Sequence, residues 1–237
     1  MFALTNSPAP LLTGPHYLSQ LQQDDQGLIR EVETILFPGV LVEIEELGEV
    51  FSKIQTNEYP STKDLWTYSA LLQKTDKKEE RQKHLPPAQT ILDSCRFLEK
   101  TPYIWGGNWP EGLPHLKKID PTLETTSLKG VDCSGLLYFA TGGYTPRNTS
   151  DLVYFGQEVC SSTLPPEEIQ SKIKPLDLLV WRGHVLIVLD KENLIESRVK
   201  DGVVITPFRK RFAEIVTLVK EANKTLHIRR WFSEPLV

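Results

Sequence analysis

The chain has 237 residues, of which 40% are hydrophobic and 24% charged, with 17 Pro and 14 Gly spread along its length. This length suits two compact domains, and the composition is that of an ordinary globular protein, which excludes a disordered chain. The formal charge of -4, with acidic and basic residues interspersed, argues against nucleic acid as the main partner. No apolar stretch approaches the roughly 20 residues that a membrane-spanning helix needs.

The first third of the chain is predicted to be a small all-β module behind a leading tail. Residues 40–45 alternate between apolar and polar side chains, and a second short run at 50–54 follows the turn around Gly48, which is typical of a hairpin. Residues 64–72 read as a further strand. The charged run that ends at Pro86-Pro87 has the composition of a connector, and the domain boundary is placed there.

The leading 20 residues lack the basic start and uninterrupted apolar core of a secretory signal. Three cysteines without close pairing argue against a disulfide framework. The expected location is therefore cytoplasmic. Removal of a signal or a non-standard export route would instead place the protein in the periplasm or at the cell wall.

The second part of the chain is predicted to be α+β. Residues 87–98 show helical apolar spacing, and the Pro- and Gly-rich stretch 102–130 reads as a long loop. A helix is expected from Cys133 to the Gly142-Gly143 pair. Four short apolar strands follow between residues 175 and 207 and predict an antiparallel sheet, closed by a helix near 210–223 and a strand near 226–232. The basic triplet 209–211 is interpreted as surface charge.

Cys133 is the candidate nucleophile. Asp132 can cap the helix that begins there, and the unsatisfied N–H groups and dipole of a helix N-terminus stabilise a thiolate and a developing oxyanion. A thiolate also needs a base, and His is the side chain suited to that task near neutral pH. His184 is the best of the five His residues because it begins an apolar strand directly after a Gly turn.

Other interpretations of these residues stay open at this point. A buried Cys is often an inert apolar side chain, and a His at the start of a strand is often only a hydrogen-bonded surface residue. The Cys and His residues show none of the close spacings of zinc sites, so neither a metal nor another cofactor is predicted.

Five segments occur in the order found in NlpC-type cell-wall peptidases, which are papain-like cysteine peptidases: YIWGG, DCSG, PRN, PLDLLVW and HVLIVL. The chain resembles that family from about residue 87 to 231. The resemblance implies a papain-like catalytic domain over residues 86–237, in which a helix bundle packs on an antiparallel sheet. The module over residues 1–85 resembles, more weakly, a bacterial SH3-like barrel of the kind that precedes such domains.

The resemblance also implies roles for individual residues. Cys133 matches the family's nucleophile and His184 its base. Tyr103, Ser134 and Asp132 match positions beside the nucleophile that contact substrate; packing and helix capping are the alternative roles for these side chains.

Three features depart from the family pattern. The family's third catalytic residue is usually His, Asn or Gln, whereas the matching position here is Glu196, with Asn193 or a backbone carbonyl as the alternative group that orients His184. Asn148 replaces the usual Asp of the Pro-Arg-Asp segment, so an acidic contact to substrate is lost or supplied by Asp151. The 108–131 loop is much longer than usual and reads either as a lid or as a surface loop.

The implied activity is hydrolysis of peptidoglycan stem peptides or muropeptides at the bond between γ-D-glutamate and diaminopimelate. An amidase or acyltransferase that uses the same thioester chemistry is an alternative, as is a non-catalytic peptide-binding relative. The sequence carries no signal for an oligomeric state.

Overall fold

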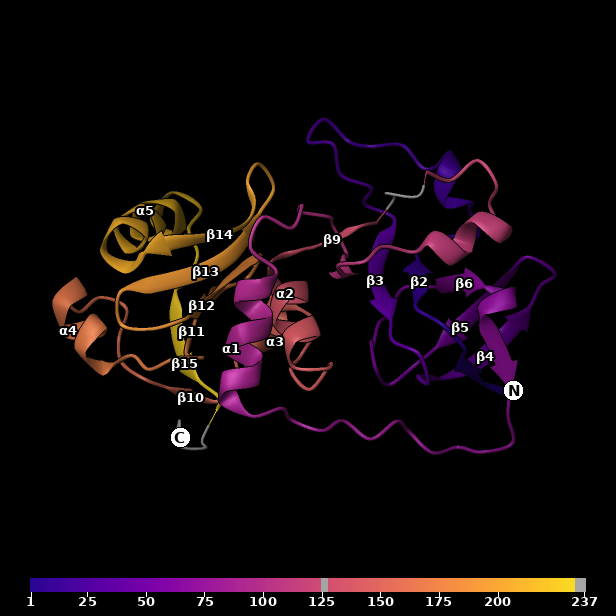
Figure 1. The fold of residues 1–237 in the computed structure, drawn as a ribbon, viewed down its shortest axis with the longest axis horizontal. Helices are drawn as coiled ribbons and strands as arrows, with labels where there is room; N and C mark the ends of the chain where they lie inside the picture. Colours follow the sequence, from indigo (N-terminus) through magenta and orange to yellow (C-terminus); the bar gives the residue numbers. More distant parts are fainter. Residues whose placement is uncertain (125–127, 233–237) are drawn as a thin grey trace. The chain divides into compact units, whose positions relative to one another are not determined.

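The computed structural model describes residues 1–124 and 128–232, which form two compact units (Figure 1). The first unit contains residues 1–83 and 104–131, and the second contains residues 84–103 and those from 132 onward. The change of unit near residue 83 lies close to the predicted boundary. The return of residues 104–131 to the first unit differs from the expectation that everything after residue 85 is one domain.

The first unit is built on a seven-stranded antiparallel sheet with the strand order β3-β2-β6-β5-β4-β1-β7. Its strands are β1 (Phe2–Thr5), β2 (Ala9–Leu12), β3 (Val32–Leu36), β4 (Leu41–Leu47), β5 (Phe51–Gln55), β6 (Leu65–Tyr68) and β7 (Leu72–Lys74). Short 3-10 helices, η1 (Leu18–Gln20) and η2 (Ser69–Leu71), interrupt the strands. The predicted hairpin is confirmed, because β4 and β5 pair with each other.

The predicted leading tail is wrong, because its residues form strands β1 and β2. Ala3, Leu11 and Leu12 in these strands are fully buried, and β2 pairs with both β3 and β6. Each strand has only four residues, which is too few for a period of two to stand out in the sequence. The resemblance of this unit to an SH3-like barrel stays a prediction.

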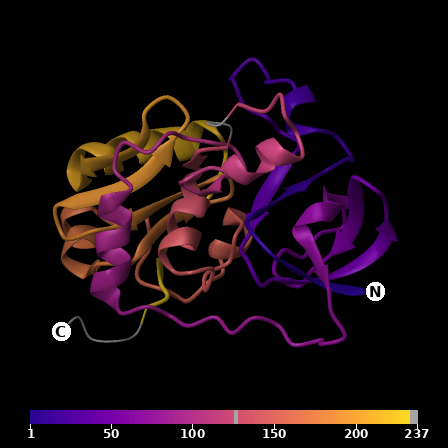
Figure 2. The ribbon, with the colours of Figure 1, turned by 45° about the vertical axis from the view of Figure 1, so that its right-hand side comes forward.

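Residues 104–124 and 128–131 belong to the first unit, and Figure 2 shows them beside its strands. They contain β8 (Asn108–Trp109), η3 (Pro114–Lys118) and β9 (Gly130–Val131), and β8 pairs with β9. The buried side chain of Asn108 accepts a hydrogen bond from the N–H of Ile35 and donates one to its C=O, both at 2.8 Å. Asp120, also buried, accepts bonds from the N–H and hydroxyl of Ser19. Residues 125–127 of the predicted 108–131 loop lie outside the described residues.

The two glycines of the WGG segment have a steric role in this unit. A Cβ on Gly106, which has φ of 69°, would lie 2.4 Å from the carbonyl oxygen of Val32 in β3. A Cβ on Gly107 would lie 2.8 Å from the carbonyl oxygen of Gly130 in β9. Only glycine permits the backbone to approach both strands this closely.

The second unit is an α+β fold around a six-stranded antiparallel sheet with the order β10-β15-β11-β12-β13-β14. The strands are β10 (Gln157–Glu158), β11 (Leu178–Trp181), β12 (His184–Val188), β13 (Asn193–Arg198), β14 (Gly202–Pro207) and β15 (His227–Arg230). The helices are α1 (Ala88–Phe97), α2 (Cys133–Ala140), α3 (Thr149–Leu152), α4 (Pro166–Lys172) and α5 (Phe208–Glu221). The antiparallel sheet and the helices predicted near 87–98, 133–141 and 210–223 are thereby confirmed.

Helices cover both faces of this sheet (Figure 1). Alternate side chains of β11 and β12, such as Leu179, Trp181 and Leu186, form one core cluster with residues of α4 and α5. The opposite face carries buried residues such as Val180 and Val185, and helix α2 packs against β12 and β13. The helix that starts at Cys133 is therefore fixed against the strand that starts at His184. In the described part of the chain, no helix is both long and apolar enough to cross a membrane.

Candidate active site

Cys133 is the first residue of α2, as the sequence predicts. Asp132 is the N-cap residue in an extended conformation, and its carboxylate accepts a hydrogen bond of 2.6 Å from the N–H of Gly135. Cys133 is buried, with an exposed fraction of only 6%. Helix α2 ends at Ala140, and Gly142 and Gly143, which both have positive φ, terminate it.

A buried arginine binds the residues on either side of Cys133. The Arg147 guanidinium donates hydrogen bonds to both oxygens of Asp132, at 3.0 and 2.6 Å, and to the hydroxyl of Ser134, at 2.8 Å. The Ser134 hydroxyl also donates to Asp132. Because all three side chains are nearly inaccessible to solvent, this network restricts the first turn of α2.

His184 begins β12 immediately after a turn at Gly183. Gly183 has φ of 111°, and its N–H donates a hydrogen bond of 2.9 Å to the hydroxyl of Thr149 in α3. On the preceding strand, the Trp181 ring packs against the imidazole with 5.2 Å between ring centroids. The position and the plane of the imidazole are therefore constrained by β11, β12 and α3.

The imidazole of His184 lies near both other predicted catalytic residues, Cys133 and Glu196. Its Nε2 atom lies 2.7 Å from a carboxylate oxygen of Glu196, and Cys133 is close enough to raise the pKa of the imidazole through its charge and hydrogen bonding. Because Nε2 meets Glu196, Nδ1 is the nitrogen available to Cys133. Glu196 lies on β13 and its side chain is 1% exposed. The structure thus brings Cys133, His184 and Glu196 together in one chain of contacts.

Arg211 of α5 is a fourth residue in this chain of contacts, because it binds Glu196. Its Nε and one terminal nitrogen donate to the two oxygens of Glu196, at 2.5 and 2.8 Å, and its other terminal nitrogen donates to Glu214 at 2.8 Å. A carboxylate buried this deeply is costly unless it is paired. The bidentate contact from Arg211 satisfies that requirement and fixes the plane of the carboxylate that faces His184.

The electrostatics favour a charged imidazole. Burial by itself lowers the pKa of an imidazole, but the charge and hydrogen bond of Cys133 and those of Glu196 outweigh it and raise the pKa of His184 to about 9. Burial raises the pKa of the Glu196 carboxyl, yet His184 and Arg211 together hold that pKa below its usual value. Glu196 is therefore an anion near neutral pH.

This arrangement can support nucleophilic acyl chemistry. An imidazolium held by Glu196 stabilises a thiolate at the N-terminus of α2, where the helix dipole acts in the same direction. After the thiolate has attacked a carbonyl, the imidazolium can donate its proton to the leaving group. Within the described residues, no group of three His, Cys, Asp or Glu side chains is arranged to hold a metal ion.

The other predicted site residues take separate positions. Tyr103 is half-buried and follows α1 at the end of the second unit's first segment. Asn148 precedes α3 as its N-cap residue, and Asp151 is exposed within that short helix. Asn193 does not orient His184, because its amide binds Asp190.

Arg211 belongs to the basic triplet 209–211 that the sequence pattern predicts to be surface charge. That interpretation is wrong for Arg211, which is 6% exposed. A signal was present, because Arg211 shares the helical spacing of the buried residues Phe208, Phe212 and Ile215. A cation on the apolar stripe of a helix needs a buried anion as its partner. Arg147 belongs to the quoted PRN segment, but its contacts with Asp132 and Ser134 had no sequence signal.

No protein-family model matches the chain, and no sufficiently similar curated protein was found. The structural neighbours are NlpC/P60 family proteins. NlpC2 from Trichomonas vaginalis is 13% identical with a TM-score of 0.41, over 99% of this chain and 73% of that one. An NlpC/P60 family protein from Bacillus cereus is 17% identical with a TM-score of 0.41, over 98% of this chain and 63% of that one.

RipD from Mycobacterium tuberculosis, described as a non-catalytic NlpC/p60 domain protein adapted to peptidoglycan binding, is 20% identical with a TM-score of 0.41. That match covers 63% of this chain and 100% of RipD. Because their TM-scores are near 0.4, these neighbours carry no argument about activity.

Proposed function

We propose that this protein is a cysteine endopeptidase that hydrolyses peptidoglycan-derived stem peptides at the bond between γ-D-glutamate and diaminopimelate. One arrangement supports the catalytic part of the proposal: the His184 imidazole contacts the buried Glu196 carboxylate at 2.7 Å, and its pKa is raised by the neighbouring Cys133 at the N-terminus of α2. The choice of substrate rests on the ordered sequence segments that resemble NlpC-type peptidases.

In the proposed reaction, the Cys133 thiolate attacks the carbonyl carbon of the scissile amide. The N–H groups of Cys133 and Ser134 in the first turn of α2 are the donors that we assign to the oxyanion. His184 transfers its proton to the leaving amine as the carbon–nitrogen bond breaks, which leaves a thioester. His184 then removes a proton from water, and hydroxide addition releases the carboxylate product and restores the thiol group.

Glu196 would act through His184, because it holds the imidazole in one orientation and stabilises the imidazolium, as the acidic residue of a Ser-His-Asp triad does. The glutamate that departs from the family pattern is therefore compatible with activity. Asp132 and Ser134 would act mainly through the shape of the first turn of α2, since Arg147 already engages both side chains.

The test is digestion of the tripeptide L-Ala-γ-D-Glu-diaminopimelate, of purified muropeptides and of whole sacculi in parallel, with products identified by mass. Cleavage at the γ-D-glutamyl bond that disappears in Cys133→Ala is the expected result. Cys160→Ala is the matched control, because Cys160 lies outside this group of contacts. Products of ammonia release or acyl transfer would indicate an amidase or acyltransferase, and cleavage that persists in Cys133→Ala would refute the assignment of the nucleophile.

A further inference from the structure

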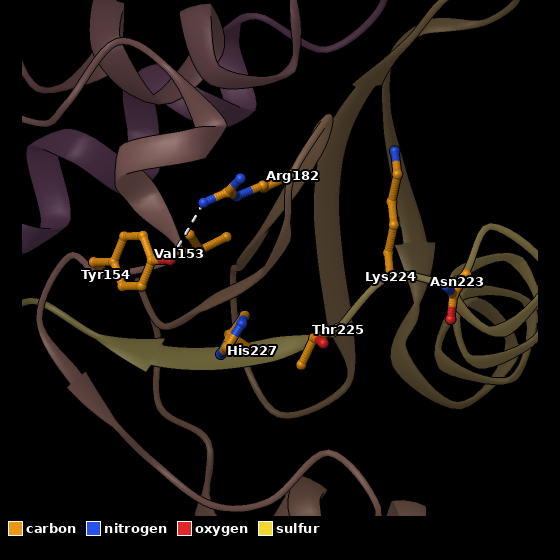
Figure 3. Close-up of a pocket in the computed structure, with 7 residues that line it drawn as sticks. All are labelled: Val153, Tyr154, Arg182, Asn223, Lys224, Thr225 and His227. Carbon is orange, nitrogen blue, oxygen red and sulfur yellow. Dashed lines mark hydrogen bonds between the residues drawn. The ribbon is translucent and has the colours of Figure 1, made fainter.

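A pocket of about 300 Å³ lies within the second unit, beside the turn that precedes His184 (Figure 3). Its lining residues come from the end of α3, the β11–β12 turn, the end of α5 and the start of β15: Val153, Tyr154, Arg182, Asn223, Lys224, Thr225 and His227. Figure 3 shows Arg182 and Tyr154 on one side and Lys224 and Asn223 on the other. None of the residues to which we assign a chemical step lines this pocket.

The lining is basic although the whole chain carries a net charge of -4. Arg182, Lys224 and His227 contribute cationic or titratable nitrogen atoms, and none of the lining residues is acidic. His227 lies 3.6 Å from Glu158, a carboxylate that also binds Arg229 at 3.2 Å. In the part of the chain that the structure describes, neither Arg182 nor Lys224 has a carboxylate at ion-pair distance.

Arg182 and Lys224 are both exposed, and each makes a contact near the pocket. Asn223, with φ of 51°, closes the C-terminus of α5, and the N–H of Lys224 bonds to the carbonyl of Val219 at 2.9 Å. On the other side, Arg182 donates a hydrogen bond of 3.3 Å to the hydroxyl of Tyr154. The Tyr154 hydroxyl proton and the Thr225 hydroxyl are further donors at the pocket.

We infer that this pocket binds a carboxylate group of the peptide ligand through Arg182, Lys224 and Tyr154. Its volume lies at the small end of ligand sites, roughly 300 to 1,000 Å³, so it accommodates a short acidic group and not a whole peptide. The identity of the ligand as a peptide substrate rests on the proposed function. The basic character of the pocket is independent of the proposed function, because it follows from the lining residues.

The pocket is connected to the catalytic group through Gly183. A Cβ placed on Gly183 would lie only 3.1 Å from the Lys224 ammonium nitrogen, and the N–H of Gly183 is held by Thr149. A carboxylate bound to both Arg182 and Lys224 would link the β11–β12 turn, directly before His184, to the segment that follows α5. Binding there would therefore position the substrate and also restrain the imidazole.

The first experiment measures binding to the full chain with Cys133→Ala, which cannot consume the ligand. The probes are the tripeptide L-Ala-γ-D-Glu-diaminopimelate and the same tripeptide with its carboxylates converted to amides, compared by calorimetry. We expect the acid to bind about tenfold more tightly, which is typical of a charge-assisted contact. Adding Arg182→Ala or Lys224→Ala should abolish the difference, whereas Lys220→Ala, which changes an exposed lysine in the last turn of α5, should preserve it.

The second experiment is independent of hydrolysis. Succinate is titrated into the isotope-labelled protein, and the amide signals of Gly183, Lys224 and Thr225 are followed by NMR. Saturable shifts confined to this region, lost in the Lys224→Ala variant, would support the pocket even if no peptide is cleaved, in which case only the proposed function fails. If the tripeptide is cleaved but succinate causes no such shifts and amidation leaves affinity unchanged, the inference is overturned while the proposed function stands.

Discussion

Arg211 binds both carboxylate oxygens of Glu196, and the same carboxylate contacts His184 on its other side. Glu196 is buried in the second unit, and its charge is compensated from two directions. A glutamate can therefore occupy a position where a neutral residue is usual in the resembled family, because α5 supplies the cation that keeps it ionised.

The substitution Arg211→Met should impair both stability and activity. It leaves Glu196 with one charged partner, and the loss of one partner from a buried ion pair costs about 3 kcal/mol. If the protein is the proposed peptidase, kcat should fall by at least about tenfold because the imidazole loses its fixed partner. Chemical unfolding and steady-state kinetics measure the two effects. Arg209→Met on the same helix is the control, since that side chain is 66% exposed; equal effects from both variants would contradict the prediction.

The pKa of His184 should depend on both of its neighbours. Cys133→Ala and Glu196→Gln should each lower it from about 9, and the first substitution should have the larger effect because Cys133 makes the stronger contribution. NMR titration of the imidazole measures this directly. A pKa that stays near 9 in Cys133→Ala would mean that the thiol group does not stabilise the imidazolium.

The same shift predicts the pH dependence of stability. The pKa of His184 is higher in the folded chain than its ordinary value of 6.5, so its contribution is fully present below pH 6.5 and is lost as pH rises through about 9. The free energy of unfolding should therefore decline between these values more steeply in the wild type than in His184→Gln. Denaturant titrations at several pH values measure this decline. An equal decline in both proteins would contradict the prediction.

The three cysteines should differ in their reaction with iodoacetamide near neutral pH. Cys133 should react fastest because it lies at a helix N-terminus beside His184. Burial raises the pKa of Cys160, and it raises the pKa of the fully buried Cys95 to about 12. Peptide mapping by mass gives the three rates. His184→Ala should slow only Cys133; a rate unaffected by this change would argue against the thiol–imidazole contact.

Gly183→Ala should affect activity more than stability. The left-handed φ of 111° costs a residue with a Cβ about 1–2 kcal/mol, and the strain falls on the turn that positions His184. Gly142→Ala is the matched control, because Gly142 also has positive φ but no neighbour within 4 Å of an added Cβ. Both variants should lose similar stability by thermal unfolding, and only Gly183→Ala should lose activity. Equal activities would show that the turn tolerates the strain.

The sequence by itself determined the elements with strong local signals. The α2 helix follows from the Asp132 cap and the Gly142-Gly143 stop, and β11 to β14 follow from apolar runs separated by turns. These signals are short-range and can be read from neighbouring residues. The pairing of Cys133 with His184 was proposed from a helix start and a strand start, and the ordered segments that resemble a known family gave it its main support.

Only the tertiary structure decided which partners complete the candidate site. Arg211 meets Glu196, and Arg147 meets Asp132, because separate elements pack together around buried carboxylates. The same holds for β1, β2 and residues 104–131, whose hydrogen bonds join positions far apart in the chain. Local periodicity contains no information on such long-range pairing, whereas the need to compensate every buried charge and backbone polar group enforces it once the chain has folded.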